Sequence, residues 1–338
     1  MKKVWWTWDV RMRWAHGFCA SAESFESNYK AAVDSACKYG VEGIVIWGFL
    51  RDSHGGVESA RRVCDYAAQH GVKILPGVGI DAYGGVFHEG DSPWSLDTYL
   101  AMNPGAQAIA KDGSPMLHHW PPTAKTARRV GCASNMELMD FYKDSLDWLV
   151  DTFDLGGFFI EQGDIGLCHC PKCKSRTRTT NLKKTPMALE DMSMRLTPIV
   201  SHALSHRKGL MILVENYCGF GPAEIAHVSR FLKDFPPEVF QSWQAYDAPA
   251  RFEITEQSNS PTEHGCMAIR TNNDLFGGEM EDIGNIRKAN RLGRQAGLDM
   301  TYIYGEYSDQ WPKTAANYRA WADSAADDCG KTGLPPQC

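Results

Sequence analysis

The stretch GGFFIEQGDIGLCHCPKC, residues 156–173, decides how the rest of the chain is interpreted. It begins with a short apolar run, residues 158–160, which is typical of a strand buried on both faces. The run ends in two acids, Glu161 and Asp164, and three cysteines with the spacing C-x-C-x2-C follow them. A buried strand that leads into acids and then into thiols predicts the rim of an active site that a metal ion braces.

Units of an apolar strand and an amphipathic helix recur on both sides of this stretch. Further strands are predicted at residues 4–8, 43–49, 72–80, 210–214, 239–243, 266–269 and 300–304. The first predicted helix has the i, i+3, i+4, i+7 spacing of a helix packed on a sheet, with apolar positions at Tyr29, Ala32, Val33 and Ala36. Eight parallel strand–helix units predict an α/β fold, a (β/α)8 TIM barrel with long βα loops.

The predicted barrel is a single catalytic domain, residues 1–326, followed by a C-terminal tail, residues 327–338. The competing architecture is a doubly wound open sheet, but no glycine-rich phosphate loop follows the first strand. A segment rich in Gly, Pro, His and Trp, residues 83–130, has a length that is usually functional inside a compact fold. Behind it, Ser134 and Glu137 form a Ser-x-x-Glu pattern, which predicts a capping box at the next helix.

Composition narrows the classes of partner. The chain has 338 residues, 43% of them hydrophobic, a net charge of −6 and a pI near 6.0, and this balance excludes the basic surface of a nucleic-acid-binding protein. No apolar run approaches the roughly 18 residues that span a bilayer, so no membrane partner is expected. No apolar signal-peptide core follows the basic start, which predicts a cytoplasmic protein unless a leader has been removed. The sequence leaves open assembly into a homo-oligomer.

The ends of the predicted strands are where a barrel places its active site. Acids gather there, at Asp9, Asp52, Asp81, Glu161, Asp164, Glu215, Asp247, Asp274 and Glu306. Tryptophans at or near strand ends could stack on sugars or simply fill the barrel, and these are Trp6, Trp8, Trp47, Trp243 and Trp311. Arg270 and Arg51 could hold a uronate or a sulfate, or pair with neighbouring acids. Acids and aromatic rings at one mouth favour an uncharged, polyhydroxylated ligand.

Glycoside hydrolysis requires two carboxyl groups across the scissile bond, one protonated and one ionised. Glu161 leaves its strand directly and is the first candidate for the acid. Asp164 is the second, although an aspartate in an Asp-x-Gly turn has an equally good structural explanation. For the base or nucleophile, Glu306 and Glu215 compete, with Asp247 behind them.

The cysteines predict a metal site. The odd total of 11 and the absence of a leader favour reduced thiols over a disulfide framework. Cys168, Cys170 and Cys173 supply three soft ligands, and tetrahedral zinc takes a fourth. Cys132 is the expected fourth ligand; His169 is the rival, but it lies between two ligands. Four thiolates leave no open position, so this zinc would be structural; the alternative is free or disulfide-paired thiols.

These motifs carry a family resemblance. A cysteine before a helix, followed by C-x-C-x2-C after the fourth strand, resembles the zinc site of family 42 β-galactosidases. The segments NPGAQAIAKDGSP (103–115), CASN (132–135) and DFYKDSLDWL (140–149) are similar to glycosidase-type barrels. The string QGDIGLCHCPKC is similar to a motif of N-acetylglucosaminidase-like barrels related to family 20 and to α-glucuronidases. One departure is that family 42 has an Asn-Glu pair at the acid/base position, which this chain lacks.

The resemblance implies a glycosidase, an O-glycosyl hydrolase with a carbohydrate substrate and a structural zinc. Two alternatives stay open from the residues alone. One is a metal-dependent sugar isomerase or epimerase, although the strand ends offer no histidine among the candidate ligands. The other is a glycan-binding barrel without catalytic activity.

Overall fold

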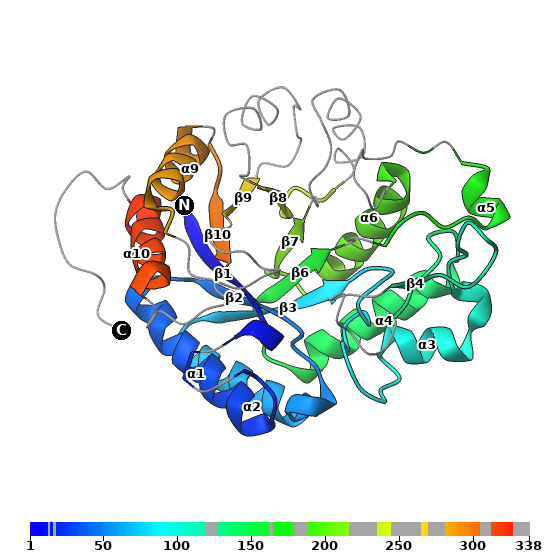
Figure 1. Cartoon of the computed structure of the whole chain (residues 1–338), viewed down its shortest axis with the longest axis horizontal. Helices are drawn as coiled ribbons and strands as arrows, with labels where there is room; N and C mark the ends of the chain where they lie inside the picture. Colours follow the sequence, from blue (N-terminus) through cyan, green and yellow to red (C-terminus); the bar gives the residue numbers. More distant parts are fainter. Residues whose placement is uncertain are drawn as a thin grey trace.

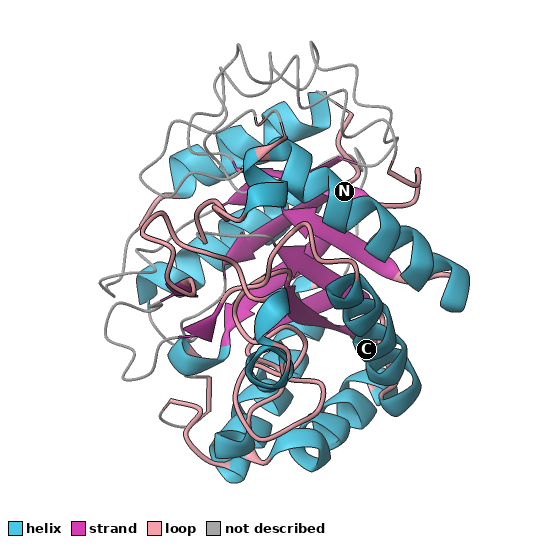
Figure 2. Cartoon of the chain, turned by 90° about the vertical axis from the view of Figure 1, so that its right-hand side faces the viewer, coloured by secondary structure: helices cyan, strands magenta, loops and turns pink. Residues whose placement is uncertain are grey.

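Eight parallel strands form a closed barrel in the computed structural model, and helices surround it (Figures 1 and 2). The structure describes residues 1–12, 14–15, 18–118, 128–161, 165–176, 178, 188–215, 235–244, 265–269, 281–295, 297–304 and 312–326. The strands are β1 (Lys2–Trp8), β2 (Gly43–Trp47), β3 (Lys73–Gly79), β6 (Gly157–Glu161), β7 (Met211–Glu215), β8 (Phe240–Gln244), β9 (Gly265–Ile269) and β10 (Met300–Tyr304). Each pairs with its neighbours in chain order and β10 returns to β1, which confirms the predicted (β/α)8 barrel. The predicted tail, residues 327–338, lies outside the described residues.

The main helices form the outer layer. They are α1 (Ala22–Tyr39), α2 (Gly56–Gln69), α4 (Glu137–Thr152), α6 (Leu189–His206), α9 (Ile283–Gln295) and α10 (Pro312–Ala326). Neighbours pack in pairs along the chain, α1 on α2, α4 on α6 and α9 on α10. None of the described helices combines the length and the apolar character that a bilayer crossing requires.

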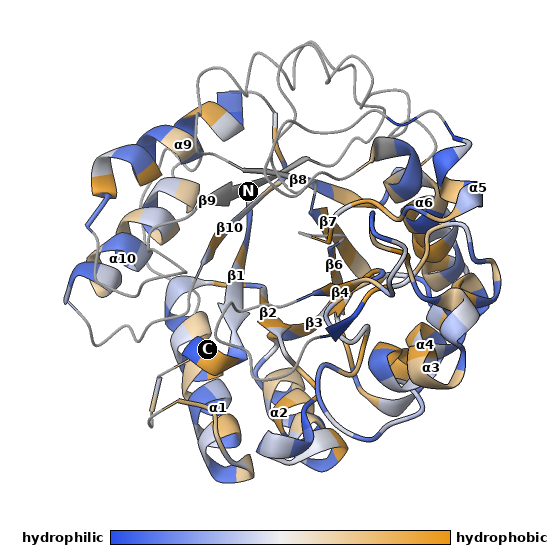
Figure 3. Ribbon diagram, turned by 45° about the vertical axis from the view of Figure 1, so that its right-hand side comes forward, coloured by the Kyte–Doolittle hydropathy of each residue, from blue (hydrophilic) through white to orange (hydrophobic). Residues whose placement is uncertain are grey.

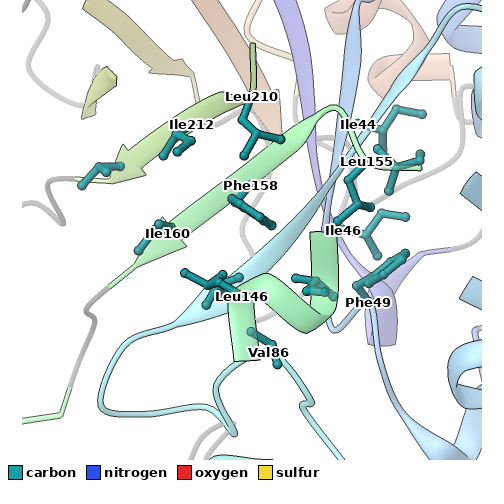
Figure 4. Close-up of a cluster of buried hydrophobic side chains, with 14 of the residues drawn as sticks. Ile44, Ile46, Phe49, Val86, Leu146, Leu155, Phe158, Ile160, Leu210 and Ile212 are labelled. Atoms are coloured by element: carbon teal, nitrogen blue, oxygen red, sulfur yellow. The ribbon is translucent and has the colours of Figure 1, made fainter. Parts of the chain in front are cut away.

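The strands alternate between two buried faces, as expected for strands enclosed by a layer of helices. Figure 4 shows side chains of the outer face, among them Ile46 of β2, Phe158 and Ile160 of β6 and Leu146 of α4, in one apolar layer. The alternate positions, for example Phe159, point into the barrel and form a second cluster. In Figure 3 the strands β2, β6 and β7 are mainly hydrophobic, whereas the surrounding helices carry hydrophilic stretches.

The long segment between β3 and α4 is structured where it is described. It contains α3 (Leu96–Met102), the 3-10 turn Pro104–Ala106, and the antiparallel pair β4 (Leu117–His118) and β5 (Arg128–Arg129). The ring of Tyr99 in α3 stacks on Phe141 in α4 at 4.4 Å, which seats this insertion on the helix layer (Figure 1). A short helix, α5 (Pro171–Lys174), follows β6 in the chain.

The predicted capping box at the start of α4 is wrong. The Leu138 amide donates instead to Asn135 Oδ1 at 2.8 Å, so an asparagine satisfies this helix end. Ser134 Oγ lies 3.0 Å from Cys173 Sγ. The serine is therefore engaged by the cysteine segment, a long-range contact that a local Ser-x-x-Glu pattern cannot anticipate.

Candidate active site and cysteine cluster

Two carboxylates close adjacent strands on the inner face of the barrel. Glu161 ends β6 and Glu215 ends β7, and the two are register partners. Both share the inward orientation of Phe159 and Leu213, two residues earlier on the same strands. Glu161 is 6% exposed and Glu215 is 1% exposed. Because neighbouring strands lie about 4.8 Å apart, the two side chains start side by side at the C-terminal mouth.

A tyrosine from β10 reaches one of these acids across the barrel. The Tyr304 hydroxyl donates to Glu215 Oε1 over 3.3 Å. The ring of Tyr304 lies 4.5 Å from the ring of Trp6 in β1. The structure thus joins strands β1, β7 and β10 at one place through an acid, a phenol and an indole.

The other predicted acids and several predicted contact residues lie outside the described residues. These are Asp164, Asp247, Glu306, Arg270 and Trp311. Trp243 lies in β8, but its side chain is not described. Their assignments stay predictions.

The predicted tryptophans of β1 and β2 belong to the barrel interior. Trp6, Trp8 and Trp47 are 7%, 9% and 6% exposed. Trp6 and Trp47 stack at 6.4 Å, and Trp47 meets Tyr83 edge to face at 5.4 Å. Little of these side chains is exposed, and their role as sugar platforms stays a prediction.

Strand β3 makes room for these rings by having no side chain at two inward positions. A Cβ on Gly77 would lie 2.3 Å from the Trp47 ring, and one on Gly79 would lie 2.4 Å from the Ala82 carbonyl oxygen. The chain then turns through two residues with positive φ, Asp81 at 63° and Tyr83 at 57°. Such backbone is uncommon outside glycine and is found at functional sites. The turn places Tyr83 against both Trp47 and His118.

Three acids of the predicted ring have structural partners: Asp9, Asp52 and Asp81, the last of which pairs with Arg195 at 3.3 Å. Asp9 is fully buried, with Oδ2 at 2.5 Å from Arg51 Nε and 3.4 Å from His54 Nε2. Asp52 Oδ2 accepts from the Asp91 amide at 3.1 Å. Arg51, considered above as a uronate ligand, is held by Asp9 and also lies 3.4 Å from Glu89. These pairs stabilise the βα loops, and among the described strand-end acids they leave Glu161 and Glu215 as the pair facing the interior.

Four cysteines lie together beside the mouth. The sulfurs of Cys132, Cys168, Cys170 and Cys173 are within 4.8 Å of one another. Cys132 Sγ lies 3.6 Å from Cys168 Sγ and 3.7 Å from both others. Tetrahedral zinc with bonds of about 2.3 Å would place its sulfurs about 3.8 Å apart. The spacing is far too long for a disulfide, and all four are free thiols compatible with a metal site.

Backbone amides and the Arg176 guanidinium contact the sulfurs. The Ile109 and Cys170 amides donate to Cys168 Sγ at 3.4 and 3.5 Å, and the Cys173 amide donates to Cys170 Sγ at 3.4 Å. Arg176 Nη2 lies 3.4 Å from Cys173 Sγ. Hydrogen bonds from the Cys132 and Cys168 thiols lower the pKa of Cys173, because they stabilise its thiolate. Thiolates are the form that binds metals.

Among the described residues, Ile165 lies between this cluster and the barrel interior. Ile165 packs against the cysteines and also against the interior apolar cluster. It lies between Glu161, at the end of β6, and Cys168 in the sequence. Ile165 therefore connects the cysteine cluster with the interior of the barrel.

Arg195 of α6 is a functional neighbour that the sequence analysis missed. It is fully buried, donates to the Cys132 and Asn135 carbonyls, and pairs with Asp81 at 3.3 Å. The Tyr142 hydroxyl also donates to Asp81. Burial raises the pKa of Asp81 although Arg195 opposes the shift. The signal for Arg195 was present as a lone cation on the apolar face of its helix.

Replacing Arg195 by methionine should destabilise the fold by about 3–5 kcal/mol, because Asp81 would stay buried without its cation. Urea unfolding measures the loss. The loss should shrink at low pH: stability falls as pH rises through the raised pKa of Asp81, and protonated Asp81 needs no cation. Arg207→Met is the control, since that arginine is 39% exposed and lies 3.5 Å from Asp154, a pair worth less than about 1 kcal/mol. Equal losses in both variants would contradict the bridging role of Arg195.

Comparison with known proteins places the fold. No protein-family model and no curated protein matches the sequence. Among solved structures, the chitobiase of Flavobacterium johnsoniae aligns with a TM-score of 0.59 at 11% identity, over 95% of this chain and 48% of that chain. The likeness is one of fold. The chain thus spans about half the length of that chitobiase.

Two further structures share the barrel. The PgaB (BpsB) glycoside hydrolase domain of Bordetella bronchiseptica aligns with a TM-score of 0.56 at 9% identity, over 95% of this chain and 99% of that one. The alpha-amylase of Geobacillus thermoleovorans, complexed with acarbose, aligns at 0.53 with 11% identity, over 90% and 70%. All three neighbours are named as carbohydrate-active enzymes, on the same fold.

Proposed function

We propose that the protein is a glycoside hydrolase whose reaction takes place at the C-terminal mouth of the barrel. The observation that carries this proposal is the pair Glu161 and Glu215, register partners that end adjacent strands and face an aromatic interior. Two carboxyl groups flanking one bond are what this reaction requires. The names of the three structural neighbours support the same class of substrate.

In this proposal Glu161 is the general acid and Glu215 is the base or nucleophile. A carboxylate only accepts hydrogen bonds, so the bond donated by Tyr304 suits Glu215 in its ionised form. Asp164 stays the second candidate for the acid. Glu306 and Asp247 stay the other candidates for the base or nucleophile.

The strand register favours retention of configuration at the anomeric carbon. Carboxyl groups about 5–5.5 Å apart let one act as a nucleophile, whereas pairs at about 6.5–9.5 Å leave room for a water and invert. Side chains that start on neighbouring strands about 4.8 Å apart match the shorter distance.

The test is a screen of wild-type protein against nitrophenyl α- and β-glycosides of neutral hexoses and N-acetylhexosamines, with NMR of the first anomer released. We expect hydrolysis of at least one glycoside with retention. Inversion would assign the reaction to a more distant pair that includes Asp164, Glu306 or Asp247. Failure to hydrolyse any of these glycosides would count against the proposed function.

We also infer that the four cysteines bind one structural zinc. The sulfur spacing and the amides directed at the sulfurs support a tetrahedral thiolate site. The likeness of the motif to the zinc site of family 42 β-galactosidases points the same way. Four thiolates fill the coordination shell, so the ion would hold the loop after β6 and take no part in the chemistry.

A further inference from the structure

His88 is a buried side chain whose two ring nitrogens lack a hydrogen-bond partner among the described residues. It is 2% exposed, and its backbone amide donates to the Leu50 carbonyl at 2.9 Å. Buried polar groups in folded proteins are normally hydrogen-bonded, because leaving them unpaired is unfavourable. Nothing in the described fold explains a histidine at this position.

The imidazole borders the aromatic layer of the barrel. Its ring meets the Trp47 ring edge to face at 5.3 Å. Trp47 in turn contacts Phe159, which precedes Glu161 by two positions on β6. His88 therefore lies next to the ring that separates it from the strand carrying the proposed acid.

The charge state of His88 indicates which class of ligand it would bind. Burial, followed by the nearby Arg51 and Arg128 and then His54, lowers the pKa of His88 well below its usual value. A neutral imidazole offers one donor and one acceptor, as a sugar hydroxyl does. Both arginines are already paired with carboxylates, Arg51 with Asp9 at 2.5 Å and Arg128 with Asp97 at 2.7 Å. No cation of this group is left to select an acidic sugar.

A second buried polar group belongs to Trp6, whose ring also contacts Trp47. Trp6 Nε1 also lacks a partner among the described residues. The Trp6 ring stacks on Trp47 at 6.4 Å and approaches Tyr304, the hydrogen-bond donor to Glu215. Two side chains whose polar groups lack a partner among the described residues, His88 and Trp6, therefore both contact Trp47.

We propose that His88 and Trp6 Nε1 bind hydroxyl groups of an uncharged sugar ring that lies against Trp47. This subsite rests on the proposed function for its carbohydrate ligand. It adds a specificity-determining residue, His88, and commits the ligand to a neutral sugar in preference to a uronate.

The test uses His88→Leu in the Glu161→Gln background, in which turnover should be strongly reduced. Titration calorimetry measures the binding of N-acetylglucosamine, galactose, glucose and glucuronate. The melting temperature of each variant is measured in parallel. We expect about tenfold weaker binding of the best neutral sugar, as for the loss of one hydrogen bond. The melting temperature should hold or rise, because no protein hydrogen bond is lost. His88→Asn, which keeps a donor and an acceptor, should recover part of the affinity.

His54→Leu is the matched control, because that buried histidine is bonded within the protein: Nε2 lies 3.0 Å from the Gly48 carbonyl oxygen. We expect it to lower the melting temperature and leave the affinity of the folded fraction unchanged.

The outcomes separate this subsite from hydrolysis. Unchanged affinity in His88→Leu beside measurable turnover of the wild type would overturn the subsite and leave the function standing. Binding that depends on His88 without any turnover would keep the subsite and overturn hydrolysis. Three other results would overturn the subsite. Glucuronate could bind more tightly than every neutral sugar, or none of the four sugars could bind. His88→Leu could also have a lower melting temperature with unchanged affinity.

Discussion

Glu161→Gln should lower the turnover of the best glycoside by about 10²–10⁴-fold, because glutamine keeps the shape of the side chain but cannot transfer a proton. Glu215→Gln should lower it at least as much, since an amide is a poor base and a poor nucleophile. Neither change alters a buried volume, and glutamine in place of Glu215 can still accept the hydrogen bond from Tyr304. Steady-state kinetics of the two variants against wild type measure the effect.

The leaving group distinguishes the two roles. A nitrophenolate departs with little help from an acid, so Glu161→Gln should retain more of its activity on nitrophenyl glycosides than on alkyl glycosides. Glu215→Gln should lose both activities alike. Glu89→Gln is the control, because Glu89 is an exposed partner of Arg51. If Glu161→Gln turned over an alkyl glycoside at the wild-type rate, the acid would have to be another residue, with Asp164 the next candidate.

Removal of the metal should destabilise the segment that carries Cys168, Cys170 and Cys173. Structural zinc sites in small domains are worth about 10–16 kcal/mol of folding free energy at neutral pH. Here the ion would connect residues 128–134 with residues 165–176. We expect the barrel to stay folded without the ion, because its main hydrophobic core is a separate cluster from the one that contains the cysteines. Purified protein should contain one zinc per chain by elemental analysis. The Cys173→Ser variant should contain no zinc, and its melting temperature should be several degrees lower than that of the wild type.

Trypsin reports the local effect. Lys172, Lys174 and Arg176 lie in or next to the short helix that starts at the cluster. They should be cleaved much faster after chelation or in Cys173→Ser. Cys37→Ser is the control, since Cys37 lies outside the cluster on α1 and is half-buried. Protein without bound metal, or with equal cleavage in both variants, would contradict the zinc site.

The barrel was predictable because each strand is a short apolar run bounded by a helix and a polar loop. The predicted strands at 300–304 and 43–49 match β10 and β2 within two residues. The cysteine cluster was predictable in part because three members lie within six positions, and Cys132 joined them as expected. The positions of Glu161 and Glu215 at the ends of strands were predictable, but the sequence left Glu306 and Asp247 as competitors of Glu215, and only the register makes Glu161 and Glu215 partners.

The rest depends on contacts between residues distant in the sequence. Asp9 and Asp81 appeared equivalent to Glu161 as strand-end acids, but each is buried against an arginine from another element, 42 positions away for Arg51 and 114 for Arg195. His88 gave no periodic signal, because its importance lies in the partners it lacks. Ser134 matched a local capping pattern, but its hydroxyl instead contacts the sulfur of Cys173, 39 positions away.

The two inward glycines of β3 bear on how this mouth can change during evolution or design. Since Gly77 and Gly79 have no side chain, the space beside them is filled by the Trp47 indole and by the segment that carries Tyr83. A smaller side chain in place of Trp47 would create space beside Gly77 without displacing any main chain. Single substitutions at Trp47 or Tyr83 could therefore change the size of the ligand that related proteins accept. A side chain added at Gly77 would instead clash with the Trp47 ring.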